Sequence, residues 1–152
     1  MESKKVLLVE DSPLIQECLR QVLSDIGGLE IVHVAPTAAL ATEWLASDSA
    51  EWDLAVIDIF LRQGHGFEVL RRCVREDPAR PAVLLSNYTR EPVRTSAAAL
   101  GADAVFDKVF ELDAFYEYCA RFAAQSTQPA VSKPAESRIC NRPPFQEKPR
   151  GA

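Results

Sequence analysis

The stretch of sequence that decides the fold class is VLLVEDSP at residues 6–13. Four apolar residues without alternation are typical of a strand buried on both faces, as in a parallel sheet. Two carboxylates, Glu10 and Asp11, follow this run directly. Ser12 and Pro13 then supply an N-cap and a first-turn proline, so these eight residues predict a strand, a loop and the start of a helix.

A second apolar run, LAVI at residues 54–57, ends in Asp58. If both runs are parallel strands of one sheet, their carboxyl ends lie side by side and bring Glu10, Asp11 and Asp58 together. Carboxylates that close repel one another unless a cation or a proton is held among them. The sequence therefore predicts a Mg²⁺-dependent phosphoryl site.

Apolar runs alternate with helical patterns through residues 1–124, which predicts one α/β domain. Its expected architecture is a doubly wound, parallel, five-stranded sheet between two layers of helices. The expected strands cover residues 6–9, 29–35, 53–59, 82–85 and 104–106, and the expected helices cover residues 13–26, 37–47, 67–76, 91–100 and 111–124. In the last helix the residues expected to face inward are Leu112, Phe115, Tyr116, Cys119 and Phe122.

Composition and charge fit one small domain with a tail. The chain has 152 residues, 47% of them hydrophobic, and no apolar stretch long enough to cross a membrane. Its net charge is −5; residues 125–152 carry five basic and two acidic side chains, a net of +3, which leaves −8 on the body. We expect a cytoplasmic protein that binds neither nucleic acid nor membrane. Residues 125–152 hold five of the ten prolines and predict a disordered tail. Whether this tail is a basic interaction arm or an uncleaved extension stays open.

The cysteines and histidines point to no metal site. No pair of cysteines has CxxC spacing, and Cys18 and Cys119 fall among apolar residues at helical spacing, so we interpret the thiols as reduced and largely in the core. His33 and His65 are interpreted as structural or solvated. The four cysteines are Cys18, Cys73, Cys119 and Cys140.

Two further polar residues follow the later strands at the same edge of the expected sheet. Ser86 comes after the fourth strand and Lys108 after the fifth. Each alone has an ordinary explanation as a turn former or a surface charge, but one such feature per strand at one edge favours a ligand site.

Phosphoryl transfer to a carboxylate explains this set of residues. Asp58 is the expected nucleophile, Asp11 a direct Mg²⁺ ligand, and Glu10 the holder of a metal-bound water. A backbone carbonyl just past Asp58, that of Phe60, is the expected further ligand. Lys108 supplies a positive charge to the phosphoryl oxygens, and the Ser86 hydroxyl can donate to one of them.

With this combination of residues the chain resembles the receiver domain of bacterial two-component response regulators, a family with a flavodoxin-like (βα)5 fold. The resemblance covers Lys4 to about Ala124 and rests on residues 6–13, on DLAVIDI at 53–59, on LLSN at 84–87, and on GAD at 101–103 with Asp107-Lys108. It implies a CheY-like phosphoacceptor protein rather than an enzyme.

The resemblance also implies the partners. Asp58 would accept its phosphoryl group from a sensor histidine kinase or a phosphotransfer protein, and Ser86 and Lys108 would relay the change to the face formed by residues 91–100, 104–106 and 111–124. A downstream protein would dock there on a chain that is a monomer or a weak dimer.

The chain departs from the family pattern at two positions. Val105 stands where members usually carry an aromatic switch residue, and Val109 follows the lysine where many carry a proline in a cis bond. We therefore expect a trans Lys108–Val109 bond and an output driven by Ser86, with Tyr88 and its loop shifting beside Val105.

Three other classes of protein are alternatives to this hypothesis. Phosphohydrolases that attack with an aspartate resemble DxDx[TV] after the first strand, and nucleotide-binding domains need a glycine-rich loop there; residues 10–13 fit neither. A phosphorylation-independent receiver that acts only as an interaction module stays open, although the intact acidic residues, Ser86 and Lys108 argue against it.

Overall fold

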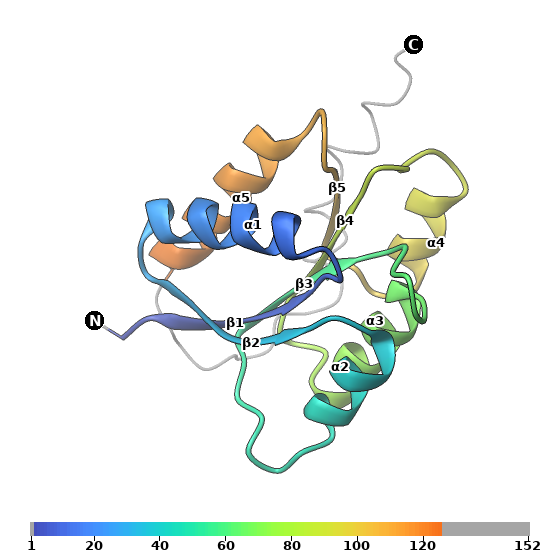
Figure 1. Ribbon diagram of the computed structural model, residues 1–152, viewed down its shortest axis with the longest axis horizontal. Coiled ribbons are helices and arrows are strands. Elements are labelled where there is room, and N and C mark those ends of the chain that lie inside the picture. Colours follow the sequence, from blue (N-terminus) through green and yellow to red (C-terminus); the bar gives the residue numbers. More distant parts are fainter. Residues whose placement is uncertain (1, 126–152) are drawn as a thin grey trace.

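The computed structural model describes residues 2–125, and these form one five-stranded parallel sheet covered by helices on both faces (Figure 1). The strands are β1 (Lys4–Val9), β2 (Leu29–Ala35), β3 (Leu54–Asp58), β4 (Ala82–Ser86) and β5 (Ala104–Asp107). The helices are α1 (Pro13–Ile26), α2 (Ala38–Leu45), α3 (Gly66–Glu76), α4 (Val93–Ala99) and α5 (Leu112–Ala124). The strand order is β2-β1-β3-β4-β5, which confirms the doubly wound α/β prediction. Residues 126–152, with most of the expected tail and Cys140, lie outside the described residues.

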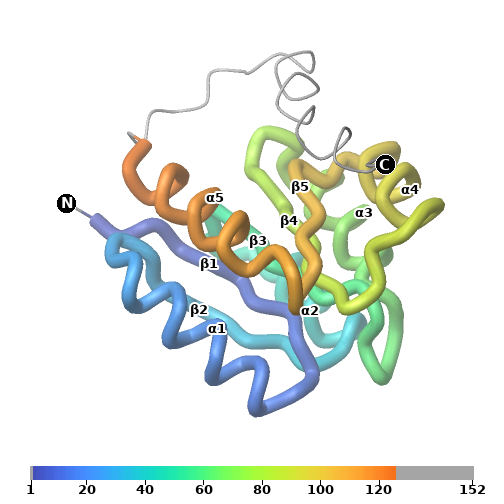
Figure 2. Tube along the Cα trace, turned by 90° about the horizontal axis from the view of Figure 1, so that it is seen from above, coloured from blue at the N-terminus to red at the C-terminus, as the bar shows by residue number. Residues whose placement is uncertain are grey.

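The sheet separates two apolar cores because successive side chains of each strand point to opposite faces. Leu7 and Val9 face the core under α2, α3 and α4, whereas Val6 and Leu8 face the core under α1 and α5. Figure 2 shows α1 and α5 side by side over one face. Every residue of β3 and β4 is buried, which explains the unbroken apolar runs of these two strands, whereas the edge strand β2 is mostly half-buried.

Local signals set most element boundaries. Ser12 caps α1 by accepting a hydrogen bond from the Ile15 backbone N–H at 3.3 Å, and Pro13 is the first helical residue. Gly27, with φ +82°, ends the helix in a conformation that favours glycine. At the other end of the domain α4 is shorter than expected, since residues 91 and 92 form a turn before it.

The prediction for the inward face of α5 was partly wrong. Phe115 and Cys119 are buried, but Leu112 and Tyr116 are 39% and 42% exposed. Tyr118 packs on the core instead, with its ring in an edge contact with Phe106 on β5. The aromatic ring on β5 therefore decides which flank of the broad apolar face of α5 is covered.

The prediction that Cys18 lies in the core was also wrong, whereas the prediction that its thiol is free is confirmed. The side chain is exposed, because Ile15, Leu19 and Leu23 define the stripe of α1 that faces the sheet and Cys18 lies at its edge. Cys73 and Cys119 are buried, and burial raises the pKa of each thiol to about 12. His65 is structural as expected, since its Nδ1 caps α3 by accepting from the Phe67 N–H at 3.1 Å.

Candidate functional site

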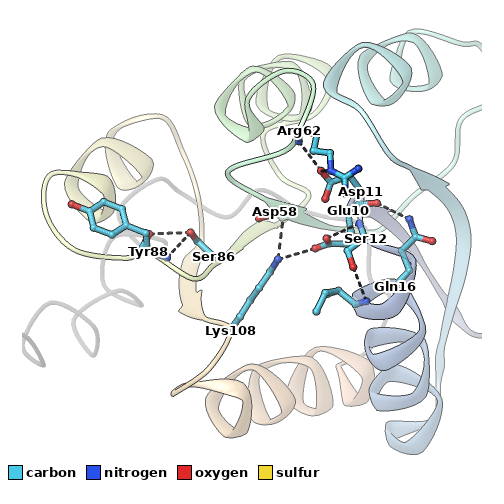
Figure 3. Close-up of polar contacts among 10 residues, drawn as sticks. Glu10, Asp11, Ser12, Gln16, Asp58, Arg62, Ser86, Tyr88 and Lys108 are labelled. Atoms are coloured by element: carbon cyan, nitrogen blue, oxygen red, sulfur yellow. Dashed lines mark hydrogen bonds and ion pairs between the residues drawn. The ribbon is translucent and has the colours of Figure 1, made fainter.

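Sheet register brings the predicted polar residues to one edge. Val9 pairs with Ile57, so that Glu10 and Asp58 are the next residues on neighbouring strands. Ser86 pairs with Asp107, directly before Lys108. Because parallel strands end together, the loops that follow β1, β3, β4 and β5 converge there (Figure 3).

Lys108 joins two of the acidic residues. Its Nζ lies 3.0 Å from Glu10 Oε1 and 3.4 Å from Asp58 Oδ2, and the lysine side chain is only 13% exposed. Figure 3 shows the ammonium group pointing between the two carboxylates. Glu10 is buried as well, and its Oε2 accepts a hydrogen bond from the Ser12 N–H at 3.1 Å. A buried charge cluster of this kind needs such partners to be stable.

Burial dominates the electrostatics of Asp58. It raises the pKa of this carboxyl from its ordinary 3.8 to about 6, against the opposing effect of the Lys108 ammonium. Repulsion from Glu10 and Asp11 contributes to the same rise in the pKa. Asp58 is therefore a carboxylate whose charge is under-compensated at neutral pH, and a cation beside it would stabilise the ionised form.

The donor set fits a hard divalent cation. Oxygen atoms of Glu10, Asp11 and Asp58 lie within 4.8 Å of one another. Ligand oxygens of an octahedral Mg²⁺ are about 3 to 4 Å apart, so a small contraction, or a water on Glu10, completes the arrangement. Phe60 lies in the loop after Asp58, and its carbonyl as a further ligand stays a prediction.

Close packing of α3 against β3 shapes the floor of the site. The Gly66 N–H donates to the Ile59 carbonyl at 2.7 Å, and a Cβ on residue 66 would collide with the backbone carbonyl of Asp58. Glycine is required here because the helix approaches the strand end so closely. The Asp58 backbone is thereby fixed.

Two supporting contacts escaped the sequence analysis. The Asp11 carboxylate accepts a hydrogen bond from the Arg62 N–H at 2.6 Å, and the Gln16 side-chain amide donates to the Glu10 carbonyl at 2.7 Å. The contact of Gln16 could have been predicted from its position one turn into the helix that follows Glu10 and Asp11. Arg62 carried no such signal because a backbone group makes the contact.

Ser86 is buried and turned away from Asp58. Its hydroxyl donates to the Tyr88 carbonyl at 3.0 Å and accepts from the Tyr88 N–H at 2.9 Å (Figure 3). Val105 is 2% exposed and lies in the core under α4, while Phe106 points to the opposite face as expected. The structure thus brings Glu10, Asp58 and Lys108 into contact, with Asp11 beside them, and places Ser86 nearby in its own closed turn.

A family comparison agrees with this geometry. The model of the response regulator receiver domain matches residues 6–120, more than half of the chain. The chain belongs to the response regulator receiver family. Receiver domains are components of two-component phosphorelay signalling, so this is the system in which the chain takes part.

Known receiver proteins show how far the likeness extends. A protein-glutamate methylesterase/protein-glutamine glutaminase of Chromobacterium violaceum is 33% identical over 104 residues, which are 68% of this chain and 28% of that protein. The chain therefore spans little more than a quarter of that relative and matches only its receiver part.

Solved receiver structures share the fold. The non-phosphorylated HemR receiver domain of Leptospira biflexa has a TM-score of 0.71 and 25% identity, and covers 85% of this chain and 100% of its own. CheY in a CheX-CheY-BeF3-Mg²⁺ complex of Borrelia burgdorferi has a TM-score of 0.72 and 18% identity, with coverage of 82% and 92%. Within residues 2–125 we find no helix with the length and apolar character needed to span a membrane.

Proposed function

We propose that Asp58 accepts a phosphoryl group from the phosphohistidine of a sensor histidine kinase or a phosphotransfer protein, in a Mg²⁺-dependent step. The observation that carries this proposal is the contact of Lys108 with both Glu10 and Asp58 at the carboxyl edge of the sheet. A buried nucleophile, two further carboxylates and a fixed ammonium group are the parts that phosphoryl transfer requires.

The chemistry assigns a task to each side chain. An Asp58 oxygen attacks the phosphorus in line, the P–N bond breaks with its electron pair going to the imidazole, and the imidazole takes up a proton from solvent. Mg²⁺ held by Glu10, Asp11, Asp58 and the Phe60 carbonyl would neutralise charge on the transferring group. Lys108 then exchanges its contact with Asp58 for one with a phosphoryl oxygen.

Output is proposed to pass through Ser86 to the face formed by α4, β5 and α5. A phosphoryl oxygen on Asp58 is a stronger acceptor than the Tyr88 carbonyl, so the Ser86 hydroxyl turns toward it and the loop with Tyr88 follows. Val105 is short and stiff at χ1 and cannot fill the vacated space as a swinging ring would. The exposed Leu112 and Tyr116 offer apolar area for a docking protein on this face.

We propose a signalling role without catalysis of an external substrate. The similarity to methylesterase response regulators covers their receiver part, so their esterase activity is not transferred to this chain. The proposed setting is the cytoplasm, with the protein a monomer or a weak dimer that binds a downstream protein and no nucleic acid.

Phosphorylation by acetyl phosphate tests this function. Intact-mass spectrometry of the parent should show one added phosphoryl group with Mg²⁺ and none with a chelator, and Asp58→Asn should show none in either condition. Asp25→Asn, an exposed carboxylate on α1, serves as the matched control and should label like the parent. Equal labelling of Asp58→Asn and the parent refutes the site; an unlabelled parent favours the phosphorylation-independent interaction module.

A further inference from the structure

We propose that Arg94, Glu111 and Asp107 form a polar clamp that positions Lys108 for contact with the phosphoryl group. This inference rests on the proposed function, because it assigns Lys108 its phosphoryl contact. The three residues of the polar clamp come from α4, from the start of α5 and from the end of β5.

Arg94 joins the three elements. Its Nη1 donates to the Val105 carbonyl at 3.1 Å, and its Nη2 donates to Glu111 Oε1 at 2.8 Å. The Arg94 and Glu111 side chains are only 16% and 17% exposed. A partly buried, hydrogen-bonded guanidinium holds its partners in a narrow range of geometries because its donors form a rigid planar fork.

Glu111 and Asp107 fix the backbone on both sides of Lys108. Glu111 Oε1 also accepts from the Asp107 N–H at 2.9 Å, and the Asp107 carbonyl accepts from the Glu111 N–H at the same distance. Asp107 Oδ1 accepts from the N–H groups of Val109 and Phe110 at 2.8 and 2.9 Å. The Lys108 N–H itself donates to the Ser86 carbonyl at 2.8 Å.

Apolar packing cannot hold this segment in place. Val109 and Phe110 are 65% and 85% exposed, so the two residues after Lys108 anchor nothing in the core. Val109 supplies an N–H to the polar clamp that a proline at this position would lack. The direction in which the Lys108 side chain leaves the sheet is therefore set by hydrogen bonds.

The reach of Lys108 makes its position matter. Its Nζ sits 3.0 Å from Glu10 and 3.4 Å from Asp58, at the end of a flexible four-carbon chain. Misplacement of a reacting group by about 1 Å can lower a rate about 100-fold. Loosening the polar clamp should slow phosphorylation without removing any Mg²⁺ ligand, which makes Arg94 and Glu111 positioning residues.

Kinetics of acetyl phosphate labelling in full-length variants test the polar clamp. Glu111→Ala and Arg94→Met should lower the rate at least about tenfold while Mg²⁺ affinity stays within about twofold of the parent. Glu111→Gln keeps the Oε1 acceptor and should recover most of the rate. Arg72→Met, which breaks the surface Arg72–Glu76 pair on α3 at the similar distance of 2.8 Å, is the control and should behave like the parent.

A double-mutant cycle separates positioning from a general loss of structure. In a Lys108→Met background, Glu111→Ala should cost nothing further, because the group it positions is gone. An undiminished effect of Glu111→Ala in that background, or a parallel loss of Mg²⁺ affinity, overturns the polar clamp.

A third measurement does not depend on phosphoryl transfer. The NMR resonance of the Lys108 ammonium and the amide exchange of Val109 and Phe110 should change in Glu111→Ala and Arg94→Met and not in Arg72→Met. If the parent is never phosphorylated, the proposed function fails, and this measurement still decides the polar clamp. An unchanged Lys108 resonance and unchanged exchange in both variants refute it.

Discussion

Replacing Asp58 with asparagine should stabilise the fold in the absence of metal, although it abolishes the proposed phosphorylation. The pKa of this carboxyl is raised from 3.8 to about 6, so the folded state binds its proton more tightly than the unfolded state does. Stability that is fully present below pH 3.8 is therefore lost as the pH rises to about 6. Above pH 6 the ionised Asp58 carries the whole penalty.

The size of the penalty follows from the shift. Two pKa units correspond to about 3 kcal/mol, and screening by solvent at the open edge of the sheet reduces this to about 1 to 2 kcal/mol. Lys108 keeps its contact with Glu10 in the variant, so no buried ammonium is left alone. For a body of this size a change of about 1 kcal/mol in the free energy of unfolding shifts the Tm by about 3 to 6 °C, which predicts a rise in Tm of about 3 to 12 °C at pH 7.5.

Thermal unfolding followed by circular dichroism at pH 4 and pH 7.5, with a chelator and with Mg²⁺, measures this effect. The advantage of Asp58→Asn should be large at pH 7.5 with chelator, small at pH 4, and reduced by Mg²⁺, which stabilises the parent by binding to its folded state. Asp25→Asn should change the Tm little at any pH. A variant no more stable than the parent at pH 7.5, or an advantage that does not vary with pH, would refute the reasoning.

Three further outcomes are expected. Lys108→Gln should bind Mg²⁺ more tightly than the parent, because one positive charge leaves the acidic cluster, but it should lose beryllofluoride binding. Fluorescence titration measures both affinities, and weaker Mg²⁺ binding would contradict the charge argument. Ser86→Ala should confine the beryllofluoride-induced changes in backbone amide shifts to residues near Asp58, whereas the parent should also change around Tyr88 and α4; equally wide changes in both would exclude a Ser86-driven output. A chain truncated after Gln125 keeps every contact described here and should retain its Tm within a few degrees; a larger drop would show that residues 126–152 pack on the body.

The sheet and the acidic site were predictable because they follow from short stretches of sequence. VLLV and LAVI are apolar without alternation, so either face of these strands would expose apolar side chains unless it were covered. Burial on both faces was therefore predictable. Parallel strands place their following residues at one edge, which brought Asp58 to Glu10 across 48 residues of sequence. The absence of a cis bond at Lys108–Val109 was also predicted correctly, since a cis bond without proline costs several kcal/mol.

The features that the sequence could not predict depend on tertiary contacts between separate elements. The apolar residues of α5 span a broad face opposite the polar residues Asp113, Glu117 and Arg121, so periodicity alone could not exclude Leu112 and Tyr116 from the core. The contact with the Phe106 ring favours Tyr118 instead. The pairing of Arg94 with Glu111 joins side chains from separate helices and has no local pattern. The closed turn of Ser86 also had no signal, because a serine at a strand end can serve the site or its own backbone equally well.

In the proposed output route, the closed turn of Ser86 sets the energy that phosphorylation must supply. Turning the hydroxyl toward Asp58 breaks two hydrogen bonds with Tyr88, each with a net contribution of about 1 kcal/mol. A charge-assisted bond to a phosphoryl oxygen contributes about twice as much as a neutral one, so gain and loss nearly balance at Ser86 itself. The helix that must respond is short, and Ala97 is its one fully buried residue, so little apolar burial opposes its displacement. A near-balanced switch acting on a lightly anchored helix would shift populations without locking them. We therefore expect a coupling between phosphorylation and partner binding of about 1 to 3 kcal/mol, or roughly 5- to 150-fold in affinity.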